Sequence, residues 1–152
     1  MTELHALVYV SRSNLDCSRD SFAASINAIL ITARANNAER GMTGALLFDE
    51  VFFAQMLEGP ASAIETTFQR IRRDQRNSDV TLLSFDAVSE RRFGEWNMAY
   101  AGASGVLLPA IRSGDILTSP TVCETGRAGR KIIDLLTSVI RHDMAREAMM
   151  PT

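Results

Sequence analysis

Two polar side chains stand inside segments that otherwise have the composition of buried strands. Gln55 lies in FFAQMLEG (residues 52–59), and Tyr9 lies in LVYVS (residues 7–11). An amide that is buried without a hydrogen-bond partner is costly, so Gln55 needs a polar neighbour, and the Tyr9 hydroxyl is a matching group. The pair is interpreted either as core residues satisfied by backbone or water, or as a network that faces a ligand.

Further polar and adaptable residues follow along the chain. Asn36 and Asn37 are typical of a helix end, and they could also read the edge of a polar ring. Trp96 and Met98 stand two residues apart, which places them on one face of a strand. They are interpreted as core packing or as a mobile pair that lines a cofactor pocket.

The segment RIRRDQRNSD (residues 70–79) is rich in arginine. Such a run is usually a solvated helix face, but its guanidinium groups could also bind a phosphate-bearing ligand. Asp74 within it could accept a hydrogen bond from a ribose or ribityl hydroxyl, or it could pair with a neighbouring arginine. The sequence leaves both interpretations open.

Signals of catalysis are weak. His5 and His142 lie near the two ends of the chain, without the partner spacing of a triad or a metal site. Cys17 and Cys123 are unclustered and are expected to be reduced thiols. No glycine-rich phosphate loop of the usual patterns is found. We therefore expect neither enzymatic activity nor a metal site.

The elements that must position these residues follow from hydrophobic periodicity. One helix is expected from about Phe22 to Asn36-Asn37, capped by Ser18 or Ser21, and a second with Pro60 in its first turn. Asp49-Glu50 are expected to form a tight hairpin. The expected strands cover residues 6–11, 44–48, 51–59, 80–88 and about 96–101.

This order, β-α-β-β-α-β-β, predicts an α+β fold with a ferredoxin-like sheet and two helices on one face. The first and third strands are neighbours at the centre of such a sheet. Because side chains alternate between faces along a strand, Tyr9 and Gln55 can point together toward the helices. The topology thus allows the two polar groups to meet.

The chain is expected to divide into a domain over residues 1–102 and a helical extension over residues 103–152. Residues 124–146 are expected to form a helix whose apolar side docks on the open face of the sheet or on another subunit. A formal net charge of -2 gives no general attraction to nucleic acid or to an anionic membrane. Without a signal peptide or a long apolar stretch, the protein is expected to be cytoplasmic.

The motifs together resemble one family. Tyr9 in LVYVS, Asn37 in NNAERGMTGALLF, Gln55 in FFAQMLEG, RRDQRNSDV and ERRFGEWNM are similar, in order and spacing, to the BLUF domain, the blue-light sensor that uses FAD. The likeness covers about residues 4–102. The tail resembles that of short stand-alone BLUF proteins, which carry two C-terminal helices and no enzymatic output domain.

The resemblance implies that a flavin lies between the two helices over the sheet, and the family favours FAD. Tyr9 would be the photoactive tyrosine, and Gln55 the glutamine that bridges it to the ring. The resemblance implies further flavin-site or photoactive residues, namely Asn37, Asp74, Arg76, Trp96 and Met98, together with Asn36 and Asn77, which stand where some members have histidine.

The resemblance also implies a mechanism. Light would drive transient electron and proton transfer from Tyr9, the Gln55 amide would rotate or tautomerise, and flavin absorption would shift to the red. The signal would reach a downstream protein or a homo-oligomer interface through the C-terminal helices. Two alternatives without light chemistry are a ferredoxin-like regulatory domain for small molecules and, less favoured, an acylphosphatase-type hydrolase.

Overall fold

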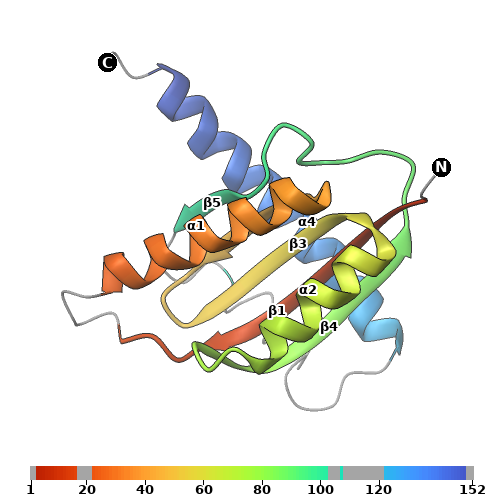
Figure 1. Cartoon of the computed structure of the whole chain (residues 1–152), viewed down its shortest axis with the longest axis horizontal. Coiled ribbons are helices and arrows are strands. Elements are labelled where there is room, and N and C mark those ends of the chain that lie inside the picture. The colour runs from red at the N-terminus through yellow and green to blue at the C-terminus, as the bar shows by residue number, and fades with distance from the viewer. Residues whose placement is uncertain (1–2, 17–21, 103–106, 108–121, 150–152) are drawn as a thin grey trace.

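In the computed structural model, which describes residues 3–16, 22–102, 107 and 122–149, the core of the protein is one five-stranded sheet (Figure 1). Its strand order is β4-β1-β3-β2-β5, and β1 and β3 pair in the centre. All pairs are antiparallel except β2 with β5. The strands are β1 (Leu4–Ser13), β2 (Thr43–Phe48), β3 (Phe52–Pro60), β4 (Asn77–Ala87) and β5 (Ala99–Gly102).

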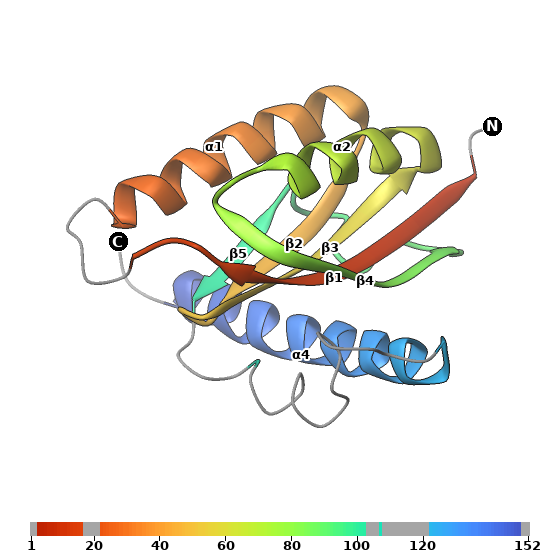
Figure 2. The ribbon, with the colours of Figure 1, turned by 90° about the horizontal axis from the view of Figure 1, so that it is seen from below.

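Helices cover both faces of this sheet. Helices α1 (Phe22–Arg40) and α2 (Ala61–Arg73) lie side by side on one face, and α4 (Val122–Met149) crosses the other (Figure 2). The predicted ferredoxin-like plan is confirmed, as is the docking of the C-terminal helix on the open face. A second C-terminal helix and the Ser18 or Ser21 cap lie outside the described residues, and the division after residue 102 stays a prediction.

Two hydrophobic layers separate the faces. The layer under α4 includes Ile132, Leu136 and Ile140, which are fully buried against side chains of the sheet. The layer under α1 and α2 contains Ile26 and Ile64. Every residue of β2 is buried, as expected for a strand with both faces covered. Among the described residues, no helix is long and apolar enough to cross a membrane.

The end of α1 corrects a prediction. The helix does not stop at Asn36-Asn37 but continues to Arg40. Gly41 follows with φ of 68°, and the Met42 amide donates to the Asn37 carbonyl at 2.8 Å. This is the left-handed glycine termination of a Schellman motif. Asn37 is therefore an interior helix residue, and its side chain is free to act elsewhere.

Other boundaries differ by a few residues. The Asp49-Glu50 hairpin is confirmed, and Glu50 has φ of 78°. Pro60 is the residue before α2 and not part of its first turn. The last strand begins at Ala99, so the expected start at Trp96 is wrong. Residues 88–98, here called the β4–β5 loop, connect the two outer strands across the end of the sheet.

Candidate functional site

Tyr9 and Gln55 meet as the topology allows. They are directly opposite each other in the antiparallel pair of β1 and β3, and the Tyr9 hydroxyl donates to Gln55 Oε1 at 2.5 Å. Tyr9 is 3% exposed and Gln55 is 5% exposed. The Tyr9 ring also packs against Phe68 of α2, with ring centroids 5.6 Å apart. The phenol is thus fixed on its partner by both hydrogen bonding and packing.

The other half of the Gln55 amide is only weakly satisfied within the described residues. Gln55 Nε2 lies 3.5 Å from Met98 Sδ, and a thioether sulfur is a weak acceptor. A primary amide carries two donors, so Gln55 keeps donor capacity at the base of a cleft that it lines. A ligand with an acceptor edge would meet that need.

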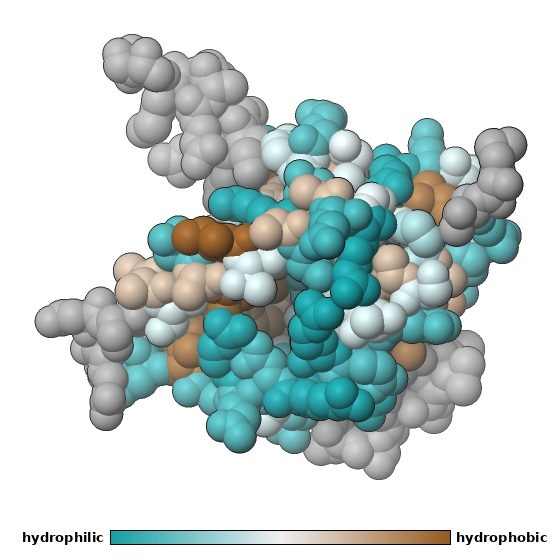
Figure 3. Space-filling view, in the orientation of Figure 1, coloured by the Kyte–Doolittle hydropathy of each residue, from teal (hydrophilic) through white to brown (hydrophobic). Residues whose placement is uncertain are grey.

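The cleft lies between α1 and α2 above β1, β2 and β3. Figure 3 shows hydrophobic surface toward α1 and hydrophilic surface toward α2 on this face of the molecule. Its apolar walls are formed by Ile29, Ala33, Leu46, Phe53 and Ile71. Its polar lining is formed by Tyr9, Thr32, Asn36, Asn37, Gln55, Thr67, Arg70, Asp74, Arg76 and Asn77. Apolar walls with a polar edge fit a flat heterocycle.

The Asn37 side chain binds the β4–β5 loop through its nitrogen and lines the cleft. It is 1% exposed, and its Nδ2 donates to the Asn97 carbonyl at 2.7 Å. Its Oδ1 has no hydrogen-bond partner among the described residues and remains an acceptor at the cleft.

Asn36 is bound to α2 instead, since its Nδ2 donates to Thr67 Oγ1 at 3.3 Å and its Oδ1 accepts from Arg70 at 3.1 Å.

At the open end of the cleft, Asp74 and Arg76 form a paired group. The Arg76 guanidinium donates to Asp74 Oδ2 at 2.5 Å. This hydrogen bond lowers the pKa of the Asp74 carboxyl and raises the pKa of Arg76. Asn77 donates to the Ile71 and Asp74 carbonyls, so it also ends α2. From the sequence, Asp74 could either contact a ligand or pair with a neighbouring arginine. In the structure it pairs with Arg76.

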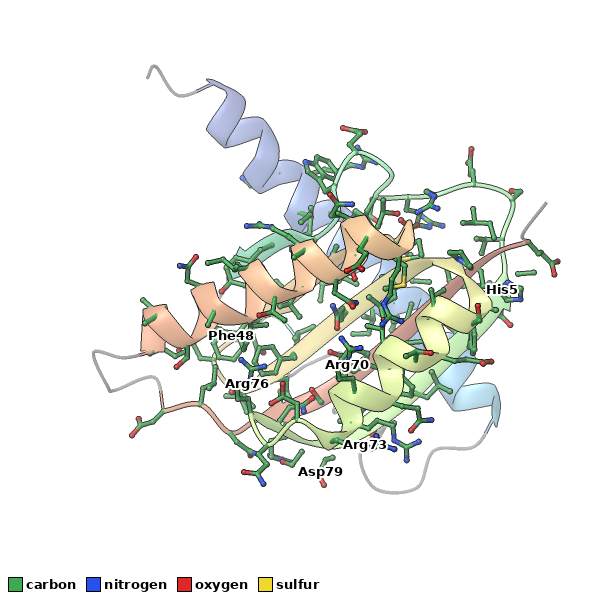
Figure 4. All side chains as sticks on the ribbon, in the orientation of Figure 1. His5, Phe48, Arg70, Arg73, Arg76 and Asp79 are labelled. Carbon is green, nitrogen blue, oxygen red and sulfur yellow. The ribbon has the colours of Figure 1, made fainter. Side chains whose placement is uncertain are left out.

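The arginine-rich segment is divided between the cleft and the outer surface. Arg70 lies over the sheet between α1 and α2, whereas Arg73 points away from it (Figure 4). Arg72 lies over the Phe68 ring at 5.8 Å. The arginine-rich composition of residues 70–79 indicated a possible ligand contact but did not distinguish Arg70 from its neighbours. The helical spacing of Arg70 from Thr67 and Asp74 could have placed it on the cleft side.

Trp96 and Met98 do not share a face, which corrects the sequence interpretation. Both precede β5, so strand alternation does not apply to them. Met98 is buried in the layer below α1 and α2, beside Gln55. Trp96 packs against the layer below α4, where the Arg141 guanidinium lies 5.8 Å from its ring centroid. The two residues thus connect the cleft with α4 from opposite sides of the sheet.

Burial raises the pKa of the Tyr9 hydroxyl well above its usual value near ~10, and the negative charge of Asp74 adds to the effect. The unfolded chain therefore loses this proton at a lower pH than the folded protein. Stability from this group is fully present below about pH 10 and falls as the pH rises further.

This linkage predicts a steeper alkaline loss of stability in the wild type than in Tyr9→Phe. The difference in slope approaches ~1.4 kcal/mol per pH unit, the value for one proton. Urea unfolding at pH 9, 10 and 11 measures it. Because Tyr100 is present in both proteins, the comparison isolates Tyr9. Equal slopes would mean that the buried hydroxyl ionises as easily as in the unfolded chain.

The fold and cleft together define a ferredoxin-like domain built to hold a flat heterocycle against a buried tyrosine–glutamine pair. The donor and acceptor set suits a flavin ring, because Gln55 Nε2 can donate and Asn37 Oδ1 can accept at the same cleft. The chain belongs to the BLUF family: the family model described as "Sensors of blue-light using FAD" matches residues 4–99. It is a member of the blue-light sensors whose cofactor is FAD.

Relatives of known function are longer proteins. The photoactivated adenylate cyclase subunit beta of Euglena gracilis is 37% identical over 101 residues, covering 66% of this chain and 11% of the relative. A beta-like protein FB from the same organism is 36% identical over 103 residues, covering 67% of this chain and 12% of the relative. This chain therefore spans about a ninth of these proteins.

Solved structures match the fold more completely. The dark-state structure of BlrB, a BLUF protein, is 31% identical with a TM-score of 0.65, covering 84% of this chain and 96% of that one. Klebsiella pneumoniae BlrP1 in a manganese and cy-diGMP complex is 34% identical with a TM-score of 0.58, covering 65% of this chain and 24% of that one.

Proposed function

We propose that Tyr9 and Gln55 are the photoactive pair of this blue-light sensor, and that light changes which of their atoms donate and accept. The observation that carries the proposal is the 2.5 Å hydrogen bond from Tyr9 to Gln55 Oε1 at a buried cleft. Tyr9 is a phenol, which can give up both an electron and a proton, and Gln55 Oε1 is in place to receive the proton.

The chain's own groups support such a switch. A bound flavin absorbs blue light and, when excited, is a strong oxidant. Rotation of the Gln55 amide by half a turn would exchange Oε1 and Nε2, so Tyr9 would accept where it now donates. Only hydrogen-bond partners change, and the two states then differ by a few kcal/mol at most, in keeping with thermal reversal in the dark.

The remaining cleft residues would hold the cofactor. Asn37 Oδ1 and Gln55 Nε2 would bind the polar edge of the ring. Arg70 and the Asp74–Arg76 pair, at the open end, offer charged groups for the rest of a flavin nucleotide. Asn36 and Asn77 line the same cleft, and their bonds to α2 support a mainly structural contribution.

We infer that the signal leaves through the β4–β5 loop toward α4. Met98 touches Gln55 on one side, while on the other Arg141 of α4 donates to the Arg92 carbonyl at 2.8 Å and lies over Trp96. We further propose that the chain acts without enzymatic activity of its own, on a separate protein or a homo-oligomer interface. The family model covers residues 4–99, and the match to the cyclase subunit covers 11% of that relative.

Absorption spectroscopy tests the proposal. The purified protein is expected to be yellow and to show a reversible red shift of its flavin bands under blue light. Hydrogen exchange in α4 is expected to differ between dark and light. A colourless protein that takes up no flavin on reconstitution would contradict the proposal and would favour a regulatory domain without light chemistry. The absence of a phosphate-binding loop in the sequence argues against a hydrolase of the acylphosphatase type.

A further inference from the structure

The β4–β5 loop is held at its centre by a buried carboxylate on the strand that carries Gln55. Glu58 of β3 is 0% exposed. Its carboxylate accepts hydrogen bonds from the Arg92 amide at 2.5 Å, the Phe93 amide at 3.0 Å and the Thr43 hydroxyl at 3.0 Å. Three donors converge on one carboxylate, and two of them belong to the loop backbone.

A neighbouring arginine strengthens this attachment. Arg91 donates to the Glu58 carbonyl at 3.2 Å and to the Gly41 carbonyl at 2.9 Å, which ties the loop to β3 and to the end of α1. Farther along, Arg34 donates to the Met98 carbonyl at 3.0 Å. The loop is therefore fixed at its middle and at the end where Met98 lies beside Gln55.

The attachment determines what the loop presents to each face of the sheet. From Arg92 and Phe93, only a few residues remain before Met98 reaches Gln55, and Trp96 within that stretch packs toward α4. A loop released from Glu58 could shift along its own path and exchange the two side chains. Their present placement thus depends on where residues 92 and 93 are anchored.

We propose that Glu58 is a positioning residue of the photoactive site: its carboxylate anchors the β4–β5 loop so that Met98, and not Trp96, packs against Gln55. The proposal rests on the photoactive role given above to Tyr9 and Gln55. Glu58 itself lies on the α4 side of the sheet with Thr43 and does not line the cleft. Its carboxylate reaches the loop through the backbone amides of Arg92 and Phe93.

The chain contains a matched control for this carboxylate. Asp49 is 1% exposed and accepts from the amides of Val51 at 3.1 Å, Phe52 at 2.7 Å and Leu107 at 3.0 Å. It lies at the other end of the β2–β3 hairpin, and these three hydrogen bonds involve no residue of the β4–β5 loop. Asp49→Asn and Glu58→Gln therefore make the same chemical change at equally buried sites, and only one of them touches the loop.

The test compares these two variants in the flavin-loaded chain of residues 1–152. Trp96 is the single tryptophan of the chain, so its fluorescence in the dark reports the loop directly. In Glu58→Gln the new amide NH₂ group is itself a donor. It therefore cannot accept the hydrogen bonds that one carboxylate oxygen accepts in the wild type from the loop amides or from Thr43. We expect a changed Trp96 emission and a dark-recovery rate altered about fivefold or more. Asp49→Asn is expected to retain wild-type values for both.

Arg91→Met provides a second, milder variant. It removes the side-chain hydrogen bonds of Arg91 to the Glu58 and Gly41 carbonyls and to the Thr43 hydroxyl, and it leaves the Arg92 and Phe93 amides on the Glu58 carboxylate. It is expected to change both measurements in the same direction as Glu58→Gln but by less, and it still tests whether the attachment of the loop sets the two measurements if Glu58→Gln does not fold. Wild-type emission and recovery in the loop variants would overturn the proposal, as would equal changes in Asp49→Asn. A wild type without any red shift would contradict the photoactive roles, while the dark emission would still test the anchor.

Discussion

Gln55→Leu is expected to bind flavin and to show no reversible red shift under blue light. Leucine is similar in volume to glutamine but has neither donor nor acceptor, so illumination has no hydrogen bond to rearrange at this position. Loss of one hydrogen bond to the ring lowers flavin affinity by about tenfold or less. Difference spectra recorded before and after illumination measure the effect.

The same variant leaves the Tyr9 hydroxyl buried without its partner, which costs about 1–3 kcal/mol of stability. Gln69→Leu is the matched control, because it makes the same substitution at an exposed position of α2. That protein is expected to retain the full red shift. A normal shift in Gln55→Leu would rule out the amide as the switching group.

Tyr9→Phe is expected to abolish the normal photocycle while the ring still packs against Phe68. Only the hydroxyl is removed, and with it the group that donates to Gln55 Oε1. Transient absorption and steady-state difference spectra measure the loss. Tyr100→Phe, which changes the other tyrosine of the chain outside the cleft lining, is expected to keep the shift.

The two variants are also expected to be non-additive in stability. Each single change leaves one buried polar group unpaired, whereas Tyr9→Phe with Gln55→Leu removes both. The double variant should therefore be less destabilised than the sum of the single variants, by on the order of 1 kcal/mol. Urea unfolding of the four proteins measures this coupling. Additive losses would mean that the 2.5 Å contact contributes little in solution.

The main features of the fold follow from local patterns in the sequence. Apolar strands and striped helices in the order β-α-β-β-α-β-β leave few topologies, and these bring the first and third strands together. The Tyr9–Gln55 contact could be predicted because both residues are polar exceptions in strands that become neighbours. The same reasoning applied to Glu58, in the same FFAQMLEG segment, would have indicated a second buried network.

The errors arise where tertiary contacts override local preference. Asn36 and Asn37 are typical of helix ends, but Asn37 Nδ2 donates to the Asn97 carbonyl in the β4–β5 loop, and α1 continues to Arg40. Strand parity placed Trp96 and Met98 together, whereas the loop turns between them before β5 begins. Both errors concern one loop, whose path is set by hydrogen bonds between distant parts of the chain.

The packing of α4 limits how this sensor can be re-engineered. Ile132, Leu136 and Ile140 supply part of the hydrophobic layer beneath the sheet, and each is 0% exposed. A photoswitch module trimmed to the first 102 residues would lack α4. The apolar side chains of the sheet that α4 covers would then be exposed to solvent and would promote self-association. Fusion partners for optogenetic use therefore belong beyond the last turn of α4, where the helix itself can serve as the rigid joint.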